Sequence, residues 1–206
     1  MPAIRAVCAL VALTLVAGCR DDGRTLDPAP TVPVSRETTT TSGPSPDDGG
    51  SGTQLGGLTL TSPAFVDGAR LDDDFTCDGA NVPPPLVIGD VPQGTAELAI
   101  VVTDRDAGGF VHWAVAGLPP AVTALESGLI PPEAIPARTD SGVEGWDGPC
   151  PPPGDDAHTY DFVVYATLEP IGLSPGVDGR DAVTLIEKAA VASGALTATY
   201  ASRTGG

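Results

Sequence analysis

The chain has 206 residues, with 10 Lys and Arg against 27 Asp and Glu, a formal net charge of −17 at pH 7. This charge argues against a nucleic-acid partner held through its phosphates, and against adsorption to anionic lipid head groups by charge alone. With 26 Gly, 22 Pro and few aromatic residues, the composition predicts a mostly β, loop-rich domain with a disordered tail rather than a helical bundle.

The first residues have the pattern of an export signal. Arg5 precedes an apolar run from Ala6 to Ala17, and about 12 apolar residues are too few to span a bilayer but fit the core of a signal peptide. The run ends in Val-Ala-Gly-Cys, which resembles a bacterial lipobox, so that residues 1–18 would be removed and Cys19 lipidated. We therefore predict an exported lipoprotein that is anchored in the membrane and faces the extracytoplasmic side. The alternative is an ordinary secretory signal cut elsewhere, with Cys19 incidental.

The segment that follows has the composition of a tether. Residues 20–54 are rich in Thr, Ser, Pro, Gly and Asp and hold almost no large apolar side chains. Such a segment buries too little surface to offset the entropy lost on ordering. We therefore predict a disordered tether over residues 19–54 and one folded domain over residues 55–206.

Short apolar, β-branched runs separated by Pro, Gly and Asp indicate a β-sheet domain. The predicted strands are Leu58–Thr61, Leu98–Thr103, Val111–Ala116, Tyr160–Leu168 and Leu196–Ala201. The second and fourth of these are apolar at consecutive positions, which predicts central strands covered on both faces. Asp181–Gly194 begins with an acidic residue, contains good helix formers and ends in glycine, which predicts a helix packed on the sheet.

Polar groups gather first around one turn between predicted strands. Asp104 and Asp106 follow a central strand, and a short glycine turn leads to His112 at the start of the next. Asp104 would then lie near His112, hold its imidazole in one tautomer and raise its pKa. The alternative is that the carboxylates only form the turn and His112 is a core histidine.

A second polar segment follows a proline-rich loop. Gly148-Pro149-Cys150-Pro151-Pro152-Pro153 has largely fixed φ angles, so its shape is set before any ligand arrives. His158 and Tyr160 then precede an apolar run, and residues two apart on a strand lie on the same side. These two side chains either face one cavity together or lie outside without a role.

The cysteines suggest a link between this loop and an earlier one. Cys8 leaves with the predicted signal peptide and Cys19 takes the lipid, which leaves Cys77 and Cys150 in an oxidising compartment. Both lie in polar, proline-rich loops. We predict a disulfide between them, with two free thiols as the alternative.

Three motifs in order carry a family resemblance. They are a D-x-D-A turn leading to His-Trp, a G-P-x-P-P loop followed by H-x-Y-x-F, and an opening SPAF segment with FTCDGANVPPPL. Together they resemble the phosphatidylethanolamine-binding protein family, in particular its bacterial Raf-kinase-inhibitor-like branch, over residues 57 to 203. The resemblance implies a β-sandwich-like fold, with one or two peripheral helices, and a small pocket for phosphate-like head groups.

The resemblance also implies a set of pocket residues. By position they are Asp104, His112, Gly148, Pro149, His158 and Tyr160, with Trp113 packed beneath. Two departures from the family pattern stand out. The first motif is usually D-P-D-A-P, whereas here Arg105 and Gly108 replace the prolines, and Thr159 replaces a common arginine, which removes a positive charge.

The leading hypothesis is a non-catalytic binding module without cofactor or metal. Two imidazoles, a tyrosine hydroxyl and backbone N–H groups of the glycine-containing loop would hold a small anion or a phospholipid head group. An alternative is a metal-dependent enzyme that uses Asp104, His112 and His158 as a two-histidine, one-carboxylate site. A second alternative is a protein-interaction role in the envelope, such as protease inhibition.

Overall fold

The computed structural model describes residues 57–203. The predicted signal peptide, the predicted lipidation site Cys19 and the predicted tether lie outside the described residues. Within the described part of the chain, no helix is both long and apolar enough to cross a membrane.

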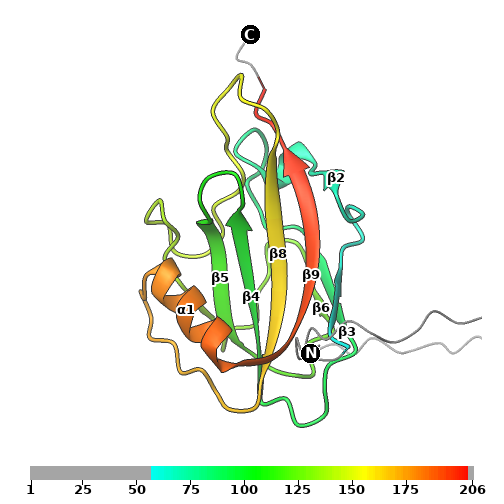
Figure 1. The fold of residues 1–206 in the computed structure, drawn as a ribbon, viewed down its shortest axis with the longest axis vertical. Helices are drawn as coiled ribbons and strands as arrows, with labels where there is room; N and C mark the ends of the chain where they lie inside the picture. The colour runs from blue at the N-terminus through cyan, green and yellow to red at the C-terminus, as the bar shows by residue number, and fades with distance from the viewer. Residues whose placement is uncertain (1–56, 204–206) are drawn as a thin grey trace, which may run out of the picture. The chain divides into compact units, whose positions relative to one another are not determined.

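Most strands belong to one six-stranded sheet, with the order β2-β9-β8-β4-β5-β7. In this order the strands are Ala69–Arg70, Ala190–Tyr200, His158–Thr167, Glu97–Asp104, Phe110–Leu118 and Ile135–Pro136. Neighbours pair antiparallel, except that β2 and β9 run parallel. The long strands β4, β5, β8 and β9 therefore form the framework of the domain (Figure 1).

A smaller sheet and one helix cover the two faces of this sheet. The smaller sheet pairs β1 (Thr59–Thr61), β3 (Leu86–Gly89) and β6 (Ala124–Leu125) in the order β1-β3-β6. Its Leu60 and Ile88 share the main core with residues of β4 and β8. On the other face, α1 (Gly179–Ala189) packs against β5, with Ile186 in a second core (Figure 1). A short 3-10 helix, η1 (Asp73–Phe75), lies before β3 in the chain.

The two cores explain the unbroken apolar run of β4. Leu98, Ile100 and Val102 point into the main core, whereas Ala99 and Val101 point into the core beneath α1. Because strand side chains alternate between faces, a strand buried on both must be apolar at every position. The prediction of β4 as a central strand is confirmed, as is the mostly β sandwich with a peripheral helix.

The helix prediction over Asp181–Gly194 is wrong in its second half. The helix ends at Ala189, and residues from Ala190 onward pair with β8 as part of β9. Gly194 is not a helix stop. It faces Val164 across the sheet, and a Cβ there would lie 2.3 Å from the Leu58 carbonyl oxygen, so glycine permits the close approach of the β1 segment.

The strand register brings the end of β4 and the starts of β5 and β8 together at one end of the large sheet. Asp104, the last residue of β4, is opposite Phe110 at the start of β5 and opposite Tyr160 near the start of β8. The turn between β4 and β5 and the loop that leads into β8 therefore meet at this end of the domain (Figure 1).

Candidate functional site

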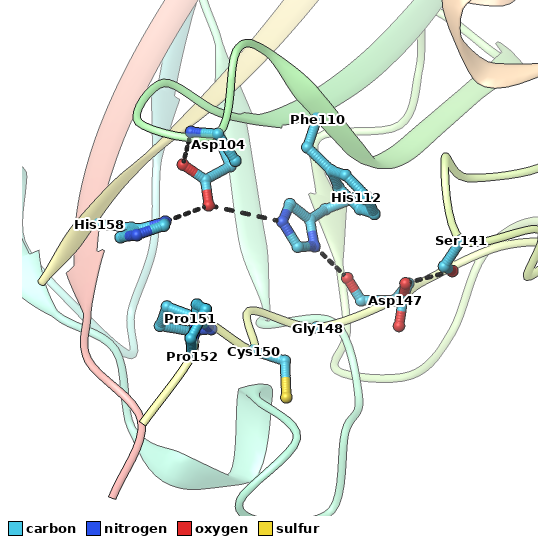
Figure 2. A pocket seen from close by; sticks show the side chains of 11 residues that line it. Asp104, Phe110, His112, Ser141, Asp147, Gly148, Cys150, Pro151, Pro152 and His158 are labelled. Carbon is cyan, nitrogen blue, oxygen red and sulfur yellow. Dashed lines mark hydrogen bonds and ion pairs between the residues drawn. The ribbon is translucent and has the colours of Figure 1, made fainter. Parts of the chain in front are cut away.

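A cavity of about 280 Å³ lies at the end of the large sheet where β4 ends and β5 and β8 begin. It lies between the β4–β5 turn and the proline-rich loop (Figure 2). Its lining combines a few ionisable groups with a mainly apolar wall. The lining residues are Asp104, Ala107, Phe110, His112, Ser141, Asp147, Gly148, Cys150, Pro151, Pro152 and His158. Four of the six residues that the resemblance implied are among them, while Pro149 and Tyr160 lie outside the lining.

Asp104 links the turn to both imidazoles. Its Oδ1 accepts hydrogen bonds from the backbone N–H groups of Asp106 at 2.8 Å and Ala107 at 2.9 Å, which fixes the turn after β4. Its Oδ2 lies 2.7 Å from His158 Nδ1 and 4.0 Å from His112 Nε2. The buried carboxylate accepts hydrogen bonds from the turn and from His158, so it positions these groups rather than offering a free oxygen to a ligand.

His112 is held from the other side by the proline-rich loop. Its Nδ1 lies 2.7 Å from the carbonyl oxygen of Asp147, and a carbonyl only accepts, so Nδ1 carries the proton and Nε2 is left facing Asp104 (Figure 2). Burial lowers the pKa of His112 and outweighs the hydrogen bond to Asp147 and the charge of Asp104. The predicted proximity of Asp104 to His112 is present, but the predicted rise in pKa is wrong.

His158 is the more accessible imidazole, with a side chain that is 17% exposed. His158 Nδ1 donates to the Asp104 carboxylate, so Nε2 is the His158 nitrogen without a hydrogen bond to the described residues. When neutral, this atom accepts a hydrogen bond. When protonated, it donates one with charge assistance.

Tyr160 lies beneath the two imidazoles instead of lining the cavity. Its ring centroid is 5.3 Å from that of His112 and 6.5 Å from that of His158. The side chain is fully buried, and its hydroxyl has no hydrogen-bond partner among the described residues. Burial and the nearby charge of Asp104 raise the pKa of Tyr160, so the phenol stays neutral and supports the rings from below.

The proline-rich loop forms the opposite wall and is fastened to the segment that follows η1. Cys77 and Cys150 are joined in a disulfide with a Cα–Cα distance of 5.4 Å. The Cys77 N–H donates to the Pro149 carbonyl at 3.1 Å, and the Gly148 N–H donates to Asn81 Oδ1 at 2.9 Å. The Gly148 N–H was expected to donate to an anion. It instead donates a hydrogen bond within the wall.

Trp113 was expected to pack beneath the pocket. It is buried in the main core, with its ring 5.7 Å from that of Trp146, and it does not line the cavity. Sequence reasoning missed Phe110, which the period-two pattern places on the same side of β5 as His112. It also missed Asp147 and Ser141, for which no local pattern signals a role.

The cavity contains no fixed positive charge, because none of its lining residues is Lys or Arg. Arg105, next to Asp104 in sequence, turns away and pairs with Asp161 at 2.5 Å. For the metal alternative, no group of three or more His, Cys, Asp or Glu within residues 57–203 is arranged to hold an ion. Among residues 57–203, the groups that can bring positive charge to this cavity are therefore its two imidazoles.

Comparisons with known proteins agree with this architecture. The Mycobacterium tuberculosis protein named "Putative lipoprotein LppC" is 41% identical over 145 residues, which cover 69% of this chain and 72% of its own. A "UPF0098 protein" of Methanothermobacter thermautotrophicus is 36% identical over 137 residues, which cover 63% of this chain and 89% of its own.

Two bacterial proteins of known structure share this fold. Escherichia coli YbcL, described as a member of the mammalian PEBP family, superposes with a TM-score of 0.67 at 29% identity, covering 71% of this chain and 99% of its own. The homologue CT736 of Chlamydia trachomatis gives a TM-score of 0.64 at 30% identity, covering 70% and 97%. The family model described as phosphatidylethanolamine-binding protein matches residues 61–201, and the chain belongs to this family.

Proposed function

We propose that this chain is an exported, lipid-anchored binding protein whose cavity takes a small anion, such as phosphate or the phosphate of a head group. The observation that carries the proposal is the pair of imidazoles converging on Asp104. Each has one nitrogen bound within the protein, and His158 keeps its Nε2 without a protein partner. The apolar wall opposite would shield the ion from water and strengthen its hydrogen bonds.

The proposed binding depends on protons. Neutral Nε2 atoms only accept hydrogen bonds, so they repel an anionic oxygen, whereas protonated ones donate to it. Anion binding should therefore strengthen as pH falls and the imidazoles gain protons. Export and a lipid anchor at Cys19 are supported by the lipobox-like sequence and by the printed name of the M. tuberculosis relative.

The test is a phosphate titration followed by proton NMR. The chain has only two histidines, so the ring resonances of His112 and His158 report on the cavity directly. We expect both to shift with phosphate at pH 6 and much less at pH 8, and His158→Ala to weaken binding at least tenfold. Arg105→Ala is the matched control, because its guanidinium lies outside the cavity. Unshifted rings at pH 6, or equal affinity in His158→Ala, would contradict the proposal.

A further inference from the structure

The disulfide is part of the cavity wall and is also accessible to solvent. Cys150 lines the cavity, across from the imidazoles (Figure 2), and both Cys77 and Cys150 are exposed. A thiolate can therefore reach a sulfur atom of this bond. Most structural disulfides in cores lack such access, and exposed ones are the more readily exchanged class.

The bridge is the covalent link between the wall and the segment that follows η1. The two joined segments share the hydrogen bonds from the Cys77 N–H to the Pro149 carbonyl and from the Gly148 N–H to Asn81 Oδ1. Both bonds lie next to the bridge: Gly148 and Pro149 are buried, whereas Cys77 is exposed. Because exposed segments open first in local unfolding, the Cys77 side of this contact is the part that the bridge holds in place.

The wall is also coupled to an imidazole. The Asp147 N–H donates to the His112 carbonyl at 3.0 Å, and the Asp147 carbonyl accepts from His112 Nδ1 at 2.7 Å. A shift of the loop therefore reaches His112 through its neighbour Asp147, and with it the tautomer that leaves Nε2 facing Asp104.

We propose that the Cys77–Cys150 disulfide is a redox gate for the cavity, an inference that rests on the proposed anion-binding function. The co-reactant is a dithiol reductant. One of its thiolates attacks a sulfur of the bridge, giving a mixed disulfide and releasing one protein thiol. The second thiol of the reductant then resolves the intermediate, so that two electrons and two protons pass to Cys77 and Cys150 and the reductant becomes a disulfide. The freed wall moves apart from the imidazoles, and ligand affinity falls.

The experiment uses the full chain carrying Cys8→Ser and Cys19→Ser, so that Cys77 and Cys150 are its only cysteines. Phosphate affinity at pH 6 is measured by histidine NMR in the oxidised state, after dithiothreitol, and after reoxidation. We expect at least tenfold weaker binding on reduction, full recovery on reoxidation, and an unchanged far-UV circular dichroism spectrum. Equal affinity with two titrated free thiols would overturn the gate. Loss of the circular dichroism spectrum on reduction would also overturn it, because the bridge would then be a requirement for folding.

Amide hydrogen exchange without ligand separates this proposal from the binding function. Reduction should speed exchange of the Gly148 and Cys77 amides while leaving those of β4 and β8 protected. If the oxidised protein binds no phosphate, the proposed function fails, and unchanged exchange at these two amides then rejects the gate independently. The double variant Cys77→Ser/Cys150→Ser is the control, since dithiothreitol must have no effect on its exchange or affinity.

Discussion

Gly148→Ala tests whether the proline-rich loop is a fixed wall. Gly148 does not have a positive φ, so alanine meets no backbone strain there. A Cβ at this position would lie 2.4 Å from Asn81 Oδ1 and 2.7 Å from the Phe75 carbonyl oxygen. Both distances are below any normal contact, so the loop must move away from the segment that follows η1.

The expected loss combines three effects. Overpacking destabilises the folded state by about 1–3 kcal/mol, and the displaced hydrogen bond to Asn81 by about 1 kcal/mol. Alanine also reduces the conformational entropy of the unfolded chain, which stabilises the folded state by about 0.4–1 kcal/mol. We expect the free energy of unfolding to fall by about 1–4 kcal/mol, a decrease in Tm of about 2 °C or more. Phosphate affinity should fall with it, since the displaced loop is the cavity wall.

The measurements are urea and thermal denaturation of the oxidised protein, together with the histidine NMR titration. Asn81 has a φ of 52°, which glycine adopts freely, so Asn81→Gly removes the nearer clash without straining the backbone. The double variant Asn81→Gly/Gly148→Ala should lose less stability than the two single changes add up to. A Gly148→Ala variant as stable as the parent, or strictly additive changes, would refute the idea of a tightly apposed wall.

The remaining predictions concern three other side chains. Glu97 is buried and accepts hydrogen bonds from the N–H groups of Gly117 at 2.7 Å and Ile171 at 3.1 Å. Glu97→Ala should therefore lower the free energy of unfolding, measured by urea denaturation, by about 2–4 kcal/mol. A change below about 0.5 kcal/mol would contradict this. Because burial lowers the pKa of His112, the unfolded chain binds a proton below about pH 6.5 before the folded chain does. The free energy of unfolding should thus decrease as the pH is lowered below that point. The decrease should be less steep in His112→Gln. Arg105→Ala, at a pair that is 60% exposed on the arginine side, should change the free energy of unfolding by less than about 1 kcal/mol and leave phosphate affinity unchanged.

The fold was predictable where hydrophobic periodicity was unambiguous. The run at 98–103 fits only a strand buried on both faces, and it is the centre of the sheet as β4. The alanine-rich stretch after Ala189 was ambiguous, because alanine favours helix locally but also fits the tight spacing of β9 against β8. Pairing with β8 makes this stretch a strand, and no local pattern in the sequence indicates that pairing.

The site was predictable in its parts but not in its connections. The motifs identified Asp104, His112 and His158, all of which line the cavity. They did not show that Asp104 bonds directly to His158, or that the Asp147 carbonyl sets the tautomer of His112. Both contacts join segments more than 30 residues apart in the chain. Every residue also has a backbone carbonyl, so the residue type does not show which carbonyl accepts a hydrogen bond.

The charge distribution determines which groups would supply affinity for the proposed anion. All five arginines of residues 57–203 are paired with aspartates, and none of them lines the cavity. On the proposed function, a bound anion would stabilise the protonated imidazoles, and by linkage those protons would strengthen anion binding by the same factor. Because burial lowers the pKa of His112, we expect phosphate to raise the pKa of that histidine when it binds. The proposed site would thus bind an anion more strongly in an acidified environment than at neutral pH.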